Sequence, residues 1–226
     1  MRTEDTVIIP LDGMCAADAY ALVRKLGQRV YAFKIHDLYD TEGPEVILSL
    51  KRSGAQRIFV DLKLHDIPET VRLRAKALKK HGADIITVHT SGGIPMMQAA
   101  LESGAEIYGV TVLTSLTDEK DEVRGIYGDM SKMIVPALAN LAAHAGLRNV
   151  VCSPQEVGFL KNYGFVDLIT PGVRSEGADR HDQKRVATPA EALRSGATKL
   201  VIGRQITKAK DPVVAVDMIA TEIAAV

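Results

Sequence analysis

The chain has 226 residues, enough for one large domain with a full core, and its 28 Lys and Arg balance 28 Asp and Glu, which excludes a charge-driven nucleic-acid or membrane partner. Its two cysteines, Cys15 and Cys152, lie far apart without zinc-site or disulfide spacing, which indicates a reducing compartment. Since no signal region is seen and no apolar stretch approaches the roughly 20 residues of a membrane helix, we expect a single cytoplasmic domain over residues 1–226.

Short β-branched runs alternate along the chain with longer amphipathic stretches. This alternation predicts parallel strands joined by crossover helices. Eight such units within 226 residues favour a closed (β/α)8 TIM barrel of the α/β class over an open sheet. We expect strands at 7–11, 32–35, 58–62, 85–89, 107–112, 150–152, 167–170 and 199–202, and helices at 16–28, 44–53, 68–80, 94–102, 131–145, 154–162, 189–195 and 212–225.

The third expected strand carries charge where a buried strand should be apolar. Asp61 and Lys63 follow the apolar run 58–60, and Asp66 comes just past the strand end. Residues two apart on a strand share a face, so the charged ends of Asp61 and Lys63 should interact. Buried charges persist only when they compensate one another, which predicts a paired array. Such an array is either functional or an ion pair that closes one end of the barrel.

Polar residues also follow the other strands. In TIM barrels the carboxyl ends of the strands carry the chemistry. No serine or cysteine here has a partner histidine, which argues against a nucleophilic mechanism, and the six histidines lack metal-ligand spacing, so no metal is expected. The polar residues and turns expected at this face are Asp12, Lys34, His36, His89, Thr114, Thr117, Ser153, Pro171, Arg174, Gly203 and Arg204.

The end of the eighth strand suggests a phosphate site. TIM barrels often bind phosphate in the loops after strands 7 and 8, through backbone N–H groups and a guanidinium fork. Gly203 and Arg204 would supply these groups, although a tight turn followed by a surface charge would give the same dipeptide. The preceding connection, 172–187, is long and rich in Gly, Arg, Asp and Gln, so we expect it to form a lid.

Taken together, these motifs resemble the orotidine 5′-phosphate decarboxylase family over nearly the whole chain. The resemblance implies conversion of orotidine 5′-phosphate to uridine 5′-phosphate and carbon dioxide in pyrimidine biosynthesis, without metal or cofactor. One departure is His36, where the family usually has Gly; it either fills space or alters ribose contacts. The resemblance is carried by Asp61-x-Lys63-x-x-Asp66-Ile67-Pro68-x-Thr70, with Asp12, Lys34, Thr170-Pro171-Gly172-x-Arg174, Asp182-Gln183 and Gly203-Arg204.

The same resemblance implies a role for each residue. Lys63 would stabilise a carbanion at C6 and protonate it, Asp61 would hold Lys63, and Lys34 would balance Asp61 and bind ribose with Asp12. The active unit would be a homodimer in which Asp66, Ile67 and Thr70 complete the neighbouring site, with Asp66 counted among the catalytic residues. The other substrate contacts would come from Thr114 or Thr117 at the pyrimidine, from Gln183, Gly203 and Arg204 at the phosphate, from Arg174 beside the lid, and from Ser153 and Pro171.

Two other functions fit parts of the pattern. A metal-dependent sugar-phosphate decarboxylase or aldolase of the same barrel group would carry an acidic magnesium ligand on strand 2, where this chain has Lys34. The chain could instead be a non-catalytic barrel that binds a phosphorylated ligand, if His36 has made the site inactive. The intact Asp61, Lys63 and Asp66 argue against this alternative.

Overall fold

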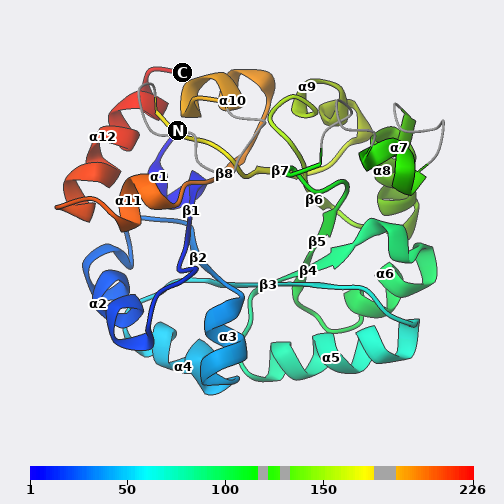
Figure 1. Ribbon diagram of the computed structural model, residues 1–226, viewed down its shortest axis with the longest axis horizontal. Coiled ribbons are helices and arrows are strands. Elements are labelled where there is room, and N and C mark those ends of the chain that lie inside the picture. The colour runs from blue at the N-terminus through cyan, green and yellow to red at the C-terminus, as the bar shows by residue number, and fades with distance from the viewer. Residues whose placement is uncertain (117–121, 128–132, 176–186) are drawn as a thin grey trace.

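A computed structural model describes residues 1–116, 122–127, 133–175 and 187–226. Its eight parallel strands pair in chain order, and β1 pairs with β8 to close the barrel, which confirms the predicted (β/α)8 fold (Figure 1). The strands are β1 Val7–Pro10, β2 Ala32–Ile35, β3 Ile58–Leu64, β4 Ile85–His89, β5 Glu106–Val110, β6 Asn149–Val151, β7 Asp167–Thr170 and β8 Lys199–Val201.

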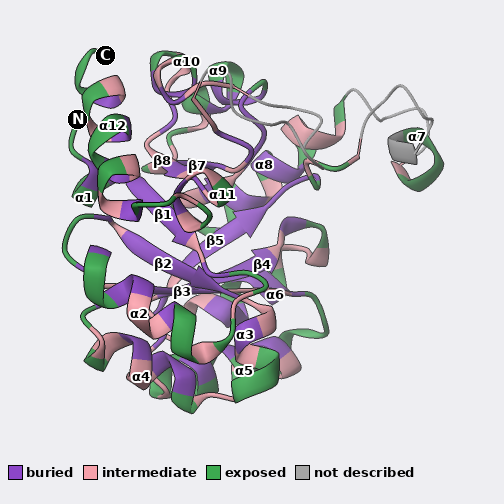
Figure 2. Cartoon of the chain, turned by 60° about the vertical axis from the view of Figure 1, so that its left-hand side comes forward, coloured by how far each residue is buried: buried purple, intermediate pink, exposed green. Residues whose placement is uncertain are grey.

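Helices surround the strands, and their outer sides are exposed while the strands are buried (Figure 2). The helices expected from the sequence are present as α2 Ala16–Leu26, α4 Glu45–Arg52, α5 Pro68–Lys80, α6 Ile94–Leu101, α8 Ile134–Ala145, α9 Val157–Leu160, α10 Pro189–Ser195 and α12 Pro212–Ala224. The helix expected at 154–162 continues past α9 as the 3-10 turn η4 Lys161–Tyr163. Shorter pieces that the sequence did not predict are α1 Thr3–Thr6, α3 Asp37–Glu42, α7 Glu122–Tyr127, α11 Arg204–Thr207 and the 3-10 turn η1 Thr90–Gly92. Segments this short hold too few residues for a helical period to appear.

Local signals fix the ends of the later helices. Thr188 and Glu191 form a capping box at the start of α10, and Gly196 ends that helix with a φ of 111°. The Asp211 side chain accepts hydrogen bonds from two backbone N–H groups at the start of α12. In the described part of the chain, no helix is both long enough and apolar enough to span a membrane.

The alternation of side chains along the strands positions the site. An apolar layer inside the barrel consists of Ile8, Ala32, Phe59, Ile85, Tyr108 and Ile169. Two residues further along their strands, Lys34 follows Ala32, Asp61 follows Phe59 and Thr87 follows Ile85, so all three point into the barrel. They lie above the apolar layer, toward the carboxyl ends of the strands.

Strand β3 departs from regular pairing at its carboxyl end. Val60 pairs with Ile86 and Leu64 pairs with Val88. Between these two pairs β3 advances four residues while β4 advances two, so β3 bulges there. Lys63 lies inside this irregularity with a φ of 44°, and no other non-glycine residue in the described ranges has a positive φ. Such a backbone costs about 1 kcal/mol or more for a residue with a side chain, and it is found mainly at functional sites.

Candidate active site

A pocket of about 1040 Å³ opens at the carboxyl ends of the strands. Its wall combines apolar side chains from inside the barrel, such as Phe59 and Ile169, with polar groups from the strand ends. Most of the site residues predicted from the sequence lie in this wall, namely Asp12, Lys34, Asp61, Lys63, Thr114, Pro171, Arg174, Gly203 and Arg204.

Four side chains of alternating charge are in contact within the pocket. Lys34 Nζ lies 3.1 and 3.0 Å from the two carboxylate oxygens of Asp12, and 3.3 Å from Asp61 Oδ2. Lys63 Nζ lies 2.9 Å from Asp61 Oδ1. The predicted pairing of Asp61 with Lys63 is therefore confirmed, whereas Asp66, which the sequence placed in the same array, is exposed and lies outside it. The two carboxylates and two ammonium groups of the observed array sum to zero formal charge, so each buried charge is compensated by a neighbour.

Asp61 is the centre of this array. Burial raises the pKa of the Asp61 carboxyl, but the charges of Lys34 and Lys63, with hydrogen bonds from Lys63 and Thr87, outweigh it and hold the pKa below its usual range. The Asp61 side chain is 11% exposed and Lys34 is 9% exposed, whereas Lys63 is 35% exposed. Asp61 is thus a fixed anion, and the Lys63 ammonium reaches the open part of the pocket.

Thr87 of β4 supports both members of the Asp61–Lys63 pair. Its hydroxyl donates to Asp61 Oδ1 at 2.9 Å and accepts from the backbone N–H of Lys63 at 2.9 Å. The second contact satisfies a donor that the irregular β3 pairing removes from the ladder. Asp61 and Lys63 therefore meet as the sequence predicted, and the backbone that carries Lys63 is irregular and held by Thr87.

His36 and Asp37 extend the charged array at the start of α3. His36 Nδ1 accepts the backbone N–H of Asp37, and its Nε2 lies 3.5 Å from Asp12 Oδ1. Asp37 Oδ2 accepts from the backbone N–H of Gly13 at 2.8 Å. His36 therefore links β2 to the loop after β1 and contacts Asp12, the residue proposed to bind ribose, so it does more than fill space.

Asp12, His36 and Asp37 are also close enough to one another to hold a metal ion, with ligand atoms within 4.8 Å. The ammonium of Lys34, however, already contacts both oxygens of Asp12 and would repel a cation at that point. We therefore describe these residues as a hydrogen-bonded cluster, and independence from metal stays a prediction.

His89 is the last residue of β4 and lies near Lys63. Its ring lies 5.4 Å from the ring of His65. Burial, helped by the nearby His65 and Lys63, lowers the pKa of His89. A neutral imidazole therefore borders the array at neutral pH and adds no further positive charge.

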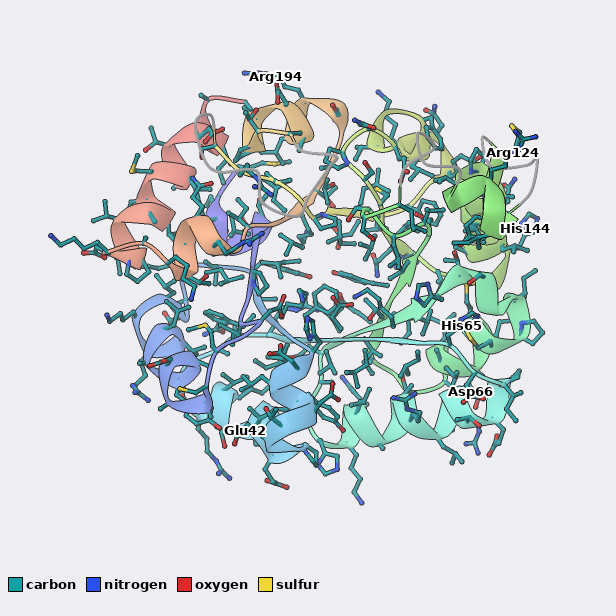
Figure 3. The ribbon with its side chains drawn as sticks, in the orientation of Figure 1. Glu42, His65, Asp66, Arg124, His144 and Arg194 are labelled. Atoms are coloured by element: carbon teal, nitrogen blue, oxygen red, sulfur yellow. The ribbon has the colours of Figure 1, made fainter. Side chains whose placement is uncertain are left out.

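Other predicted residues lie outside the pocket wall. Asp66 and Ile67 are exposed, in the loop between β3 and α5, with Thr70 in the first turn of α5; Figure 3 shows Asp66 near the edge of the molecule, away from the middle of the barrel. Ser153 is fully buried, and its hydroxyl accepts from the backbone N–H of Gln155 at 3.3 Å. Thr117 and the Asp182-Gln183 pair lie outside the described residues.

Comparison with known proteins agrees with this site. Residues 5–219 match the Orotidine 5'-phosphate decarboxylase / HUMPS family. The chain belongs to that family. An "Orotidine 5'-phosphate decarboxylase" of Moorella thermoacetica is 43% identical over 240 residues, covering 99% of this chain and 94% of that protein. One of Pelobacter propionicus is 41% identical over 232 residues, covering 97% and 95%.

A solved structure of an orotidine 5'-phosphate decarboxylase has the same fold. The crystal structure of the orotidine 5'-phosphate decarboxylase of Lactobacillus acidophilus superposes with a TM-score of 0.82 at 35% identity, covering 97% of this chain and 99% of that one. Membership of the orotidine 5'-phosphate decarboxylase / HUMPS family confirms the resemblance drawn from the sequence motifs.

Three supporting residues of this family member were missed by the sequence analysis. Thr87 stands in a β-branched strand, where Thr is an ordinary strand former, so only its alternation with Ile85 could have pointed to the pocket. Asp37, and Gln205, which lines the pocket and accepts the backbone N–H of Ser175 at 2.9 Å, come one residue after positions that were singled out. Their roles depend on contacts between loops that no spacing in the sequence reveals.

Proposed function

We propose that this pocket converts orotidine 5′-phosphate to uridine 5′-phosphate and carbon dioxide, as a step of pyrimidine biosynthesis. Family membership and the relatives at 43% and 41% identity support the activity. The observation that carries the mechanism is the buried Asp61 carboxylate, held between the ammonium groups of Lys34 and Lys63 at the mouth of the barrel.

The chemical difficulty is electrostatic. When the bond from C6 to the carboxylate breaks, its electron pair stays on C6 in an sp² orbital that the ring cannot delocalise well, and carbon dioxide leaves. A fixed cation beside C6 stabilises this charge more in the transition state than in the ground state, which raises the rate. Lys63 supplies the cation. A proton then passes from its ammonium to C6, which completes uridine 5′-phosphate and leaves a neutral amine for solvent to reprotonate.

Asp61 and Lys34 prepare Lys63 for this step. Because its pKa is held low, Asp61 stays ionised and fixes the Lys63 ammonium at 2.9 Å. Asp61 also faces the substrate carboxylate, and their repulsion is relieved as carbon dioxide leaves. Lys34 balances the second oxygen of Asp61 and, with Asp12, presents one donor and one acceptor to the ribose hydroxyls.

The rest of the substrate is held by the loops around the mouth of the barrel. Gly203 and Arg204 bind the 5′-phosphate, joined by Gln183, with Arg174 beside them. A Cβ at Gly203 would lie 3.0 Å from Pro10 Cγ, so glycine lets this turn pack closely against the end of β1. The remaining proposed contacts are Thr114 or Thr117 with the pyrimidine, and Pro171 and Ser153 with the substrate.

We propose further that the active unit is a homodimer. Ile67 is 66% exposed, so its apolar side chain is available to a partner beside Asp66. Asp66 is also exposed, and its Oδ1 accepts from the backbone N–H of Ile67 at 2.7 Å, which fixes the turn leading into α5. These residues and Thr70 would complete the pocket of the neighbouring subunit. A single catalytic domain, a cytoplasmic location and the lack of any cofactor belong to the same proposal.

The decisive experiment compares Lys63→Ala with the native protein by following the absorbance of orotidine 5′-phosphate in buffer that contains a metal chelator. The native protein should turn over, and Lys63→Ala should lose all measurable turnover while keeping its circular dichroism spectrum. Lys25→Ala, which changes an exposed lysine of α2, serves as the matched control and should keep normal activity. Near-normal kcat in Lys63→Ala would refute the role of Lys63. Loss of native activity in the chelator would favour a metal-dependent reaction.

A further inference from the structure

Three side chains join the loop after β7 to the segment after β8. The backbone N–H of Ser175 donates to Gln205 Oε1 at 2.9 Å, and Gln205 Nε2 donates to Ser175 Oγ at 2.7 Å. The Ser175 hydroxyl donates in turn to Glu222 Oε2 of α12 at 2.6 Å. All three residues are partly buried, so these bonds are shielded from full competition by water.

The hydrogen-bond directions in this cluster are mutually consistent. A carboxylate only accepts, so the single hydroxyl hydrogen of Ser175 goes to Glu222 and leaves the hydroxyl oxygen to accept from Gln205. The Ser175 N–H needs an acceptor, which fixes the carbonyl oxygen of the Gln205 amide on that side. Gln205 therefore holds Ser175 at two points, and the charge of Glu222 strengthens the chain of bonds.

Two members of the cluster are next in sequence to the two arginines of the proposed phosphate end. Ser175 follows Arg174, and Gln205 follows Arg204 in the first turn of α11. Both arginines and Gln205 line the pocket. The third member, Glu222, stands on α12 between the buried residues Ile219 and Ile223, so it is anchored to the core.

We infer that Gln205, with Ser175 and Glu222, is a positioning clamp that fixes the spacing of the two arginine-bearing loops for a phosphate dianion. Gln205 and Ser175 thus act through Arg174 and Arg204 rather than at the reacting atoms. The inference rests on the proposed function, in which these arginines meet the 5′-phosphate of the substrate.

Loops are held less firmly than the strands that carry them, and a dianion gripped from two loops needs both at one spacing. If the clamp supplies that spacing, its loss should be felt only by a substrate that has a phosphate. Each of the two hydrogen bonds between Gln205 and Ser175 contributes about 1 kcal/mol, which sets the size of the expected loss. The kcat/KM for orotidine 5′-phosphate should therefore fall by about tenfold or somewhat more. The nucleoside orotidine, which has the same ring and ribose, should react at an unchanged rate.

The test measures kcat/KM with orotidine 5′-phosphate and with orotidine for three clamp variants. Ser175→Ala removes the hydroxyl bonds but keeps Gln205, Gln205→Ala removes both bonds to Ser175, and Ser175→Thr keeps a hydroxyl. We expect the two alanine variants to lose about tenfold on the phosphorylated substrate alone, their double variant to lose little more, and Ser175→Thr to stay near native. Gln98→Ala, which changes an exposed residue of α6, is the matched control.

Each other result would overturn the clamp. Equal losses on both substrates would show a merely structural role, and no loss would show no role. A selective loss in Gln205→Ala without one in Ser175→Ala would make Gln205 a direct phosphate ligand. Arg204→Ala separates the two levels of the argument: if it is selective while the clamp variants are not, only the clamp fails, and if it affects both substrates equally, the phosphate site fails and the clamp with it.

Discussion

Replacing Asp61 by Asn tests the electrostatic core of the mechanism, because the two side chains have nearly the same shape. The amide can still contact Thr87 Oγ1, which lies 2.9 Å from Asp61 Oδ1. It cannot carry the charge that holds Lys63 Nζ at 2.9 Å and Lys34 Nζ at 3.3 Å. The change therefore removes two ionic contacts and leaves two ammonium groups facing a neutral side chain.

The expected loss follows from these two contacts. A hydrogen bond to a charged partner contributes about 1.5 to 3 kcal/mol. The two contacts of Asp61, with Lys63 and with Lys34, together contribute about 3 to 6 kcal/mol. Since about 1.4 kcal/mol corresponds to a factor of ten, kcat/KM should fall by about 10² to 10⁴. We expect most of the loss in kcat, because Asp61 positions the group that meets the developing charge.

The assay is the loss of orotidine 5′-phosphate absorbance at neutral pH, with kcat and KM determined separately. Asp217→Asn is the matched control, because Asp217 pairs with Arg29 at 2.9 Å on the surface, where both side chains are about half exposed. Circular dichroism checks that the barrel is folded. A fall of less than about tenfold in Asp61→Asn would show that Lys63 does not depend on Asp61, and the mechanism would need another anchor for the ammonium.

Three further results are expected. Mixing Asp66→Ala with Lys63→Ala subunits should restore activity, because one site of each heterodimer regains both native residues; no recovery despite subunit exchange would place the whole site in one chain. Arg204→Ala should lower kcat/KM for orotidine 5′-phosphate by about 10-fold to 100-fold and leave orotidine nearly unaffected, because only the phosphate loses a charge-assisted contact. The free energy of unfolding should fall as the pH is lowered through 6.5. The pKa of His89 is lower in the folded chain than in the unfolded chain, so in this range the unfolded chain binds a proton at His89 more readily. His89→Gln should flatten that part of the profile in urea unfolding, and an unchanged slope would contradict the assignment.

The barrel and the identity of the charged residues could be predicted from sequence because both depend on local patterns. Eight apolar runs each followed by an amphipathic stretch indicate the fold without any knowledge of contacts. Lys34 and Asp61 stand out because they occupy inward positions of strands that are otherwise apolar. Here the period of two along a strand is enough to assign the face and the depth in the barrel.

The geometry at Lys63 could not be predicted in the same way. The period of two places Asp61 and Lys63 on one face, and their contact is confirmed, but β3 carries extra residues there and Lys63 has a φ of 44°. Nothing in the residue type signals this, because Lys is a poor candidate for a left-handed backbone. The distortion is stabilised from β4 by Thr87, and a contact between strands is invisible to a local pattern.

The same reason explains why His36 and Gln205 were undervalued. Each lies in a short helix or at its boundary, where no period is measurable, and each acts through a residue on another loop. His36 reaches toward Asp12, 24 residues earlier in the chain, and Gln205 reaches back 30 residues to Ser175. Such pairs become neighbours only after the barrel closes.

The charges of the two ends of the pocket suggest how binding is converted into rate. At the ring end, the substrate carboxylate would face Asp61, whose low pKa keeps it an anion, so this contact alone opposes binding. At the other end, Arg174 and Arg204 line the pocket and, as proposed, would attract the phosphate and offset that repulsion. In the proposed mechanism, the repulsion from Asp61 would disappear as carbon dioxide departs, the attraction of Lys63 for C6 would grow, and the contacts at the phosphate would stay the same. On this proposal the transition state would be stabilised at the ring end, where the ground state is destabilised, and the phosphate contacts would supply the binding energy that holds the substrate there.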